Sequence, residues 1–332
     1  MHGAERLRAH LRRAAERRAP LASSGRTTAY RWVHGRADGI EGATVDVFSD
    51  VLVLALYAEM EPGPLVEALV AEGSPRAVYV KRRPRAASRL GPDALRERAP
   101  TAPLHGTAVE AVDVLEEGLT FRIRPAEGLA VGLYLDMRDT RAFVRAHATG
   151  TTLLNCFSYT GGFAVAARAG GATAAVNLDV SKRALRWAEE NAALNGHLPL
   201  AADALCGDAF SWLRRLAKAG RTFSTVVLDP PAFARGPSGA FSAARDMPEL
   251  VARAAAVVAP GGVLIACCNQ QSLSAERFFG LVQRGLAASG RPGKRLRRLG
   301  ASPVDFPERN GESTGLKVEV LRLDANALAS FS

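Results

Sequence analysis

The sequence lacks any long, uninterrupted apolar run, so we expect no helix of the ~20 apolar residues that a bilayer span requires. Its first residues, MHGAERLRAHLRRAAERR, carry charge where a secretory signal peptide needs an apolar centre. Its four cysteines lack the paired spacing of a zinc site, so we expect reduced thiols and no bound metal. These absences predict a cytoplasmic protein. With 332 residues, 48% of them hydrophobic, the chain can form two domains and an extension.

Lysine and acidic residues are also scarce. Lysine occurs only five times, and lysine plus arginine outnumber aspartate plus glutamate by 43 to 33. The formal net charge of +10 therefore comes from arginine, which binds phosphates bidentately and stacks on bases. A genome rich in Arg and Ala codons would also raise the arginine content, but it would not leave acids so outnumbered. We favour nucleic acid as the partner.

Residues 1–28 are predicted to form a basic N-terminal helical extension. Within a helix over residues 2–19, Leu7 and Leu11 lie on one side and arginines cover much of the rest. Pro20 and the Ser-Ser-Gly cluster that follows it predict the end of this helix. Three interpretations stay open: an RNA-contacting arm, a solvated helix or disordered tail, and a mitochondrial transit peptide, which the two acids in the helix disfavour.

Residues 29–127 are predicted to form a small α+β domain that contacts RNA. Turn glycines separate segments of alternating apolar residues, and strands are expected at Ala43–Val47, Val51–Leu56 and Ala77–Lys81, with a helix near Pro64–Glu72. A cationic run begins at the end of the last strand and is either a solvated face or a phosphate-binding strip: Lys81, Arg82, Arg83 and Arg85.

From residue 128 to 330 strand and helix patterns alternate, which predicts an α/β fold: a Rossmann-like domain with a mostly parallel sheet and helices on both faces. The stretch Leu153–Asp179 runs from an apolar strand through a glycine turn and a helix to a second strand. Gly161 and Gly162 permit a tight turn that brings helix amides near a ligand, and Asp179 can accept from two ribose hydroxyls. This stretch predicts a nucleoside-binding frame. Other strands are expected around Leu200–Cys206 and at Thr225–Asp229, Gly262–Cys267 and Leu316–Leu323.

Two further carboxylates follow the next strands. Asp208 is placed to contact an adenine amino group, and Asp229 opens the sequence Asp-Pro-Pro-Ala-Phe that ends at Phe233. Carboxyl ends of parallel strands lie at one edge, where open α/β sheets bind ligands. One aspartate at a strand end is usually a helix N-cap, but the joint spacing of three is poorly explained in that way. The Gly-x-Gly-x-x-Gly pattern of dinucleotide enzymes is absent.

Together these motifs resemble those of S-adenosylmethionine methyltransferases. The sequences YRWVHGRADGIEGATVDVFSDVLVLAL, GLYLDMR and NCFSYTGGFAV resemble the RlmI-like bacterial large-subunit (23S) ribosomal RNA methyltransferases, from about residue 30 to about residue 325. The resemblance implies S-adenosyl-L-methionine as cofactor and ribosomal RNA as partner. The cofactor-binding residues that it implies are Tyr134, Asp136, Arg138, Asn155, Phe157, Tyr159, Gly161, Gly162, Asp179, Asp208, Asp229 and Pro230.

Within this group, Arg138 is expected near the cofactor carboxylate and Asp136 near its amino group, because a zwitterion needs one partner of each sign. An ordinary surface ion pair of Arg138, Asp139 and Arg141 at helical spacing is the other interpretation. Upstream of the resemblance the chain has room only for the basic helix, so we expect it to lack the family's N-terminal PUA domain. The arginine-rich residues 291–300 are then either part of the RNA grip or a solvated loop.

The chemistry at the acceptor depends on GGVLIACCNQQSLS, after the fifth strand. The RlmI-like enzymes carry a nucleophilic cysteine here, but an ungapped alignment puts Asn269 at its position, with Cys268 one residue earlier. Methylation of cytosine carbon-5 needs a thiolate that first adds to the neighbouring ring carbon. Either Cys268 is this nucleophile, or a ring nitrogen such as guanine N7 or an exocyclic amine attacks directly. Small buried hydrophobes are the ordinary interpretation of these cysteines.

Asp229 and Phe233 complete the predicted catalytic group with Cys268. The acid would accept from the edge of a flipped base while the ring stacks on its face; a packed loop with a buried phenylalanine is the structural interpretation. A catalytically silent cofactor- and RNA-binding assembly factor is a further hypothesis, which the displaced cysteine motivates. A homodimer is left open.

Overall fold

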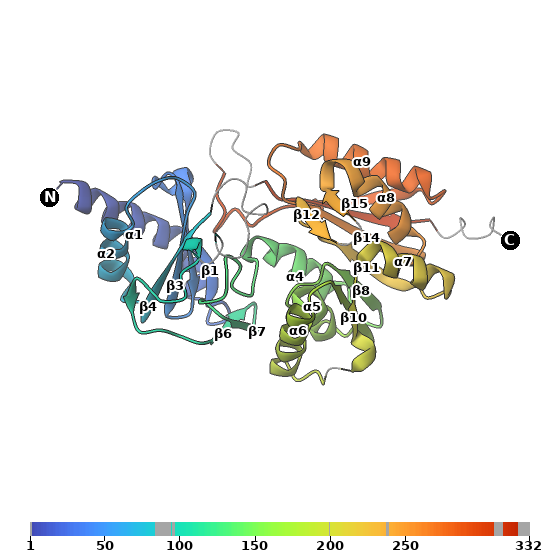
Figure 1. Ribbon diagram of the computed structural model, residues 1–332, viewed down its shortest axis with the longest axis horizontal. Helices are drawn as coiled ribbons and strands as arrows, with labels where there is room; N and C mark the ends of the chain where they lie inside the picture. The colour runs from blue at the N-terminus through green and yellow to red at the C-terminus, as the bar shows by residue number, and fades with distance from the viewer. Residues whose placement is uncertain are drawn as a thin grey trace. The chain divides into compact units, whose positions relative to one another are not determined.

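The computed structural model describes residues 2–83, 94, 97–198, 200–236, 239–308 and 315–324 (Figure 1). The chain divides into two compact units, one of Met1–Arg138 with Ser302–Glu312 and one of Asp139–Ala301 with Ser313–Ser332. This division differs from the predicted boundaries near residues 28 and 127, since the N-terminal helix is part of the first unit. Within the described ranges, the helices include none with the length and apolar character that crossing a membrane would need.

The first unit contains a five-stranded sheet in the order β1-β2-β3-β4-β5. Strands β3 and β4 are parallel, and the other neighbours are antiparallel. The parallel pair requires a crossover, which helix α2 (Gly63–Gly73) supplies. The predicted strands and helix are confirmed to within one residue; the strands are Ala29–His34 (β1), Ala43–Phe48 (β2), Val51–Leu56 (β3), Ala77–Arg82 (β4) and His105–Gly106 (β5), with a separate hairpin of Val112–Glu116 (β6) and Leu119–Ile123 (β7).

The N-terminal helix α1 (His2–Ala22) packs within the first unit. Leu11 and Ala14 are buried in one apolar cluster with Trp32, whose indole N–H donates to the Leu11 carbonyl oxygen at 3.0 Å. The helix continues through Pro20 instead of ending there. Because one of its faces is core, the interpretations as a fully solvated helix or a disordered tail are wrong. An RNA contact by its exposed arginines stays a prediction.

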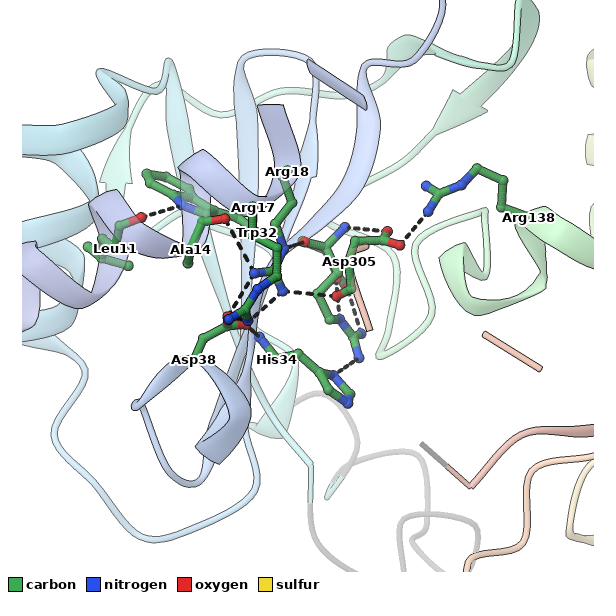
Figure 2. Close-up of polar contacts among 11 residues, drawn as sticks. Leu11, Ala14, Arg17, Arg18, Trp32, His34, Asp38, Arg138 and Asp305 are labelled. Carbon is green, nitrogen blue, oxygen red and sulfur yellow. Dashed lines mark hydrogen bonds and ion pairs between the residues drawn. The ribbon is translucent and has the colours of Figure 1, made fainter. Parts of the chain in front are cut away.

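Arg18, also on α1, is fully buried among oxygen acceptors (Figure 2). Its two terminal nitrogens donate to the Asp38 carboxylate oxygens at 2.7 and 2.6 Å, and its Nε donates to the Arg31 carbonyl oxygen at 2.9 Å. One of the terminal nitrogens also donates to the main-chain carbonyl of Asp305 at 3.0 Å. This guanidinium therefore joins α1, the turn after β1 and the Ser302–Glu312 segment.

The second unit contains a seven-stranded sheet in the order β10-β9-β8-β11-β14-β16-β15. The first five strands are mutually parallel, and the last two are antiparallel to their neighbours. The predicted α/β class with a mostly parallel sheet is confirmed. The strands are Thr152–Cys156 (β8), Ala174–Asp179 (β9), Ala204–Cys206 (β10), Phe223–Leu228 (β11), Val258–Cys268 (β14), Gly293–Leu299 (β15) and Lys317–Leu323 (β16).

Helices cover both faces of this sheet (Figure 1). Helix α4 (Arg138–Ala146) leads into β8; α5 (Gly162–Ala169) and α6 (Lys182–Leu194) lie on one face, and α7 (Ala209–Lys218), α8 (Ala243–Ala255) and α9 (Ala275–Ala288) lie on the other. The larger apolar cluster lies between α7, α8, α9 and the sheet and includes Leu213, Met247, Phe278 and Leu321.

Two elements of the second unit escaped prediction. Residues 293–299 form β15, the edge strand beside β16, so the loop interpretation of this stretch is wrong. Its charges hide the strand pattern, but an edge strand can carry such charges because one of its sides faces solvent. A hairpin of β12 (Phe233–Gly236) and β13 (Gly239–Ser242) follows β11.

The buried Arg18 predicts a large loss of stability on truncation. We expect Arg18→Ala to lower the free energy of unfolding by roughly 3–5 kcal/mol, because it leaves the buried Asp38 carboxylate without its bidentate partner. Urea unfolding measures the loss. Arg6→Ala, on the exposed side of the same helix, is the control and should cost less than about 0.5 kcal/mol. Equal effects of the two substitutions would contradict a structural role for the Arg18 pair.

Candidate active site

The five parallel strands of the second unit end in register at one edge of the sheet. Cys156 of β8 pairs with Leu178 of β9 and with Leu228 of β11, and Leu228 pairs with Ala266 of β14. The strand order reverses beside β8, because β9 lies on one side of it and β11 on the other. Open α/β sheets bind ligands at such a switch point. This edge carries the predicted residues Phe157, Tyr159, Gly161, Gly162, Asp179, Asp208, Asp229, Pro230, Phe233 and Cys268.

The turn between β8 and α5 has an unusual backbone. Phe157, Tyr159 and Gly161 have φ values of 60°, 48° and 77°, and non-glycine residues rarely adopt such angles. Strain of this kind concentrates at ligand sites, where surrounding contacts hold it in place. Asp179 supplies one such contact, since its Oδ2 accepts from the Tyr159 N–H at 2.9 Å. The tight turn predicted from the two glycines is confirmed.

Gly161 lies directly against α6. A Cβ atom there would lie 2.7 Å from the Ala188 Cβ and 3.1 Å from the Asn177 Nδ2. At Gly162, a Cβ atom would lie 3.2 Å from the Arg141 Cδ. A side chain at Gly161 would therefore push the turn away from α6, in addition to straining the backbone.

Asp179 is oriented by two main-chain amides. Its Oδ2 accepts from Tyr159 and its Oδ1 from Ser181, both at 2.9 Å. Burial raises the pKa of this carboxyl, and the backbone N–H donors oppose the shift. A carboxylate has about four acceptor positions, and the Val180 N–H also lowers this pKa, so capacity remains for a hydroxyl donor. The geometry suits the predicted ribose contact, which stays a prediction.

The side-chain oxygens of Asp208 and Asn155 differ in their hydrogen-bond partners. Asp208 is the N-cap of α7, and its Oδ1 accepts from the Ser211 N–H at 2.9 Å. Asn155 is 1% exposed, and its Nδ2 donates to the Asn177 Oδ1 at 2.9 Å. The Asn155 Oδ1 is buried and has no hydrogen-bond partner among the residues that the structure describes. A buried acceptor without a partner is costly, and a donor on a ligand would remove that cost.

Three predicted cofactor residues belong to the first unit: Tyr134, Asp136 and Arg138. Arg138 is 3% exposed and forms an ion pair with Asp305, 167 residues away in sequence (Figure 2). This buried pair, and not a surface pair at helical spacing, is the ion pair of Arg138. Its Nη1 has no hydrogen-bond partner within the described part of the chain. The predicted role of Arg138 at the cofactor carboxylate stays a prediction.

Cys268 ends β14 and is 1% exposed. Burial raises the pKa of its thiol; the Gln270 N–H and the Lys317 ammonium oppose the shift, and Asp229 adds to it. Lys317 lies opposite Cys268 in the β14–β16 pair. The thiol is therefore protonated in the free protein, but it lies beside an amide and a cation that can stabilise a thiolate. Asn269, at the position that the alignment assigns to the family cysteine, is exposed.

Asp229 and Pro230 follow β11 directly, and Phe233 begins β12. Pro230 is buried, whereas the Phe233 side chain is 47% exposed. The interpretation of Phe233 as a buried packing residue is therefore wrong. An exposed aromatic ring three residues after a buried proline is available for stacking.

The cationic run at the end of β4 does not form the predicted phosphate-binding strip. Lys81 is fully buried, and its Nζ donates to the Pro100 carbonyl oxygen at 3.3 Å. Burial and the nearby Arg83 lower the pKa of Lys81 to about 8. Arg82 and Arg83 are half-buried and donate to main-chain carbonyls of their own unit, and Arg85 lies outside the described residues.

Two residues of these sites were missed by sequence reasoning. Asp305 is the partner of Arg138, and Lys317 is the cation beside Cys268. Both are distant in sequence from the residues they contact. The strand that carries Lys317 was predicted, but its antiparallel pairing with β14 was not, and only that pairing brings the two side chains together.

Known proteins resemble this chain in sequence and structure. Residues 30–322 match the S-adenosylmethionine-dependent methyltransferase family. The ribosomal RNA large subunit methyltransferase of Deinococcus radiodurans is 34% identical over 97% of this chain and 79% of that protein. The ribosomal RNA large subunit methyltransferase I of Aeromonas salmonicida is 33% identical over 87% of this chain and 73% of that protein. The crystal structure of SMU.776, described as a methyltransferase complexed with SAH, has a TM-score of 0.86 at 25% identity and covers 96% of this chain and 81% of that one.

A mostly parallel sheet with this strand order defines a class I methyltransferase fold. The chain belongs to the S-adenosylmethionine-dependent methyltransferase family, and the expected resemblance to the RlmI-like proteins is confirmed. S-adenosylmethionine is its cofactor and supplies a methyl group activated on a sulfonium. Residues of the second unit fit this group, since the Asn155 Oδ1 has no hydrogen-bond partner among the described residues and Asp179 has acceptor capacity left.

The close approach at Gly161 generates one prediction. We expect Gly161→Ala to destabilise the protein by about 1–3 kcal/mol through overpacking and to weaken S-adenosylmethionine binding, because the turn must shift. Gly196→Ala is the matched control, since Gly196 has a φ of 75° but no atom within 4 Å of its Cβ position. It should lose stability yet keep its affinity for the cofactor. Calorimetric titration and urea unfolding measure both quantities, and equal affinity losses would show that backbone angle alone matters.

The carboxylate of Asp179 generates a second prediction. Because burial raises its pKa, protonation begins at a higher pH than for an ordinary aspartate, and the protonated form accepts hydroxyl donors less well. Affinity for S-adenosylmethionine should thus be full above this pKa and fall as pH drops through it. Asp179→Asn should bind roughly 10- to 100-fold more weakly at neutral pH and lack this pH dependence. Titrations of both proteins from neutral to mildly acidic pH test this, and parallel curves would refute the assignment.

Proposed function

We propose that the chain transfers the methyl group of S-adenosylmethionine to a base of large-subunit ribosomal RNA. The names of the relatives from D. radiodurans and A. salmonicida support this substrate. The observation that carries the proposal is the exposed ring of Phe233, behind Asp229 and a buried proline at the edge of the sheet. A flipped base can stack on this ring while the acid accepts from the base edge.

Carbon-5 of cytosine is the acceptor if Cys268 is the nucleophile. The Cys268 thiolate would add to the neighbouring ring carbon, and the electron-rich carbon-5 would then displace the methyl group from the sulfonium, leaving S-adenosylhomocysteine. Loss of the carbon-5 proton to a base and departure of the thiolate restore the aromatic ring. Lys317 and the Gln270 N–H favour the thiolate, as this route requires.

A base nitrogen, such as guanine N7, is the alternative acceptor. Its lone pair can attack the methyl group directly, so no thiol is needed, and catalysis then rests on placement of the base. Two observations favour this route: burial raises the pKa of Cys268, and the exposed residue after β14 is Asn269. A third outcome is that the protein binds S-adenosylmethionine but transfers no labelled methyl group to any RNA. This outcome would favour a catalytically silent assembly factor.

The two routes make opposite predictions for Cys268→Ser. On the carbon-5 route the variant should lose methyl transfer and retain cofactor binding, because a hydroxyl is a far weaker nucleophile. The wild type should also form a covalent adduct with RNA that contains 5-fluorocytidine, and this adduct should survive denaturation. The fluorine on carbon-5 cannot leave as a proton does, so the thiolate stays bonded to the ring. Cys267→Ser, one residue earlier and also buried, is the control and should keep activity. Full activity of Cys268→Ser without an adduct would exclude the carbon-5 route and leave the nitrogen route.

A further inference from the structure

The cations of β15, its preceding loop and β16 fall into groups with different surroundings. Arg291 is 2% exposed and donates to the carbonyl oxygens of Ala255 and Val258, so it belongs to the packing of the second unit. Arg295 and Arg298 both pair with the buried carboxylate of Glu319, at 2.8 and 3.0 Å. These three arginines have structural partners.

The side chains of Arg295 and Arg298 face α9. Arg295 lies 3.5 Å from the Phe279 ring centroid, and Arg298 lies 3.5 Å from Glu276, both residues of α9. Arg295 also lies opposite Leu321, which belongs to the apolar cluster on that face. The β15–β16 register shifts between Arg295 and Arg297, which interrupts the alternation of β15, so the face of each β15 residue follows from its partner on β16. Val320 and Arg322 alternate with Leu321 along β16, so these two and the residues opposite them point to the other face.

Lys294, Arg297 and Arg322 occupy that other face, and we call them the cationic row. Lys294 lies directly opposite Arg322, and Arg297 lies opposite Val320, two residues from Arg322 on the same side of β16. All three are exposed. Among the described residues, none of them has a hydrogen bond or ion pair to a carboxylate.

The row places like charges against one another. Opposed residues of an antiparallel pair have side chains within about 5.5 Å of each other at Cβ, and like charges in that position are destabilising. Two positions along a strand span about 6.8 Å, so all three long side chains can converge on one anionic chain. A bound polyanion would turn this repulsion into attraction.

We propose that the cationic row is a phosphate-binding surface for the RNA substrate. This inference rests on the proposed function and adds to it a place where the RNA backbone is held. Two of the three residues lie on β15, the edge strand of the sheet, which has a neighbouring strand on one side only. Guanidinium and ammonium groups bind phosphates independently of base sequence, so the row would position the RNA and not select the methylated base.

The test compares two variants that remove the same charge. Lys294→Gln/Arg297→Gln/Arg322→Gln neutralises the row. Arg186→Gln/Arg214→Gln/Arg284→Gln neutralises three exposed arginines on α6, α7 and α9 of the same unit. Binding of deproteinised large-subunit ribosomal RNA to the full chain is measured across a salt series. Each single-strand phosphate contact releases about 0.7 counterions, so the slope of log K against log salt should be less steep by about 2 in the row variant. The control variant should keep the slope of the wild type.

A single substitution separates binding from folding. Lys294→Glu replaces a like-charge pair with an opposite-charge pair, so we expect a slightly higher unfolding midpoint together with weaker RNA binding. A residue that is retained only for structure would not give opposite signs in these two measurements. Cofactor titration should be unchanged in every variant.

The outcomes separate this inference from the proposed function. If the wild type methylates RNA but the row and control variants have equal salt slopes, the cationic row is not a phosphate-binding surface, although the proposed function stands. If the wild type neither binds RNA nor methylates it, both fail. Unchanged RNA binding with lost association to ribosomal particles would assign the row to a protein partner and overturn the RNA inference.

Discussion

Parallel strand pairing is the constraint on which the second unit depends. Strands that run in one direction must end at the same edge, and the registers of β8, β9, β11 and β14 align those ends. Segments far apart in sequence, from the glycine turn at Gly161 to the thiol of Cys268, are thereby brought to one edge. Strand pairing thus places the segments of the candidate site at one edge of the sheet. The side chains at that edge determine which ligand binds there and which reaction follows.

Buried charge shapes the candidate site as much as exposed charge does. Arg138 is held by Asp305, yet one of its nitrogens has no partner in the described residues. Burial raises the pKa of the Cys268 thiol, yet this residue lies opposite Lys317. Ligand contacts at these two groups stay predictions. Such incomplete satisfaction is costly in a folded core, which is why it marks the residues with the strongest claim to function.

The sequence was sufficient for the fold class, since alternating strands and helices and a glycine turn are local signals. The sequence was also sufficient to predict that the carboxylates at strand ends lie at one edge, because the carboxyl ends of parallel strands meet at the same edge of a sheet. It was insufficient for Asp305, Lys317 and β15. Asp305 lies in a segment that joins the first unit although the second unit separates the two in sequence, Lys317 depends on antiparallel register, and β15 carries charges that mask strand periodicity. The positions of Asp305, Lys317 and β15 all depend on which distant segments pair in space. The residue pattern within one segment does not indicate that pairing.

Net charge alone is a poor guide to where RNA binds. The surplus of basic residues that first suggested a polyanionic partner includes Arg18 and Arg291, which are buried and bound to protein oxygens, and Lys81, whose ammonium is desolvated. The arginines of residues 291–300 differ in the same way: Arg291 is buried, Arg295 and Arg298 pair with Glu319, and Arg297 is exposed without a carboxylate partner among the described residues. A cation suited to a phosphate contact is therefore one that is exposed and has no carboxylate partner. A second cation directly opposite it on the neighbouring strand strengthens this criterion. By this criterion the edge of β15 and β16 is a better RNA surface than the run after β4, although the two are equally basic in sequence.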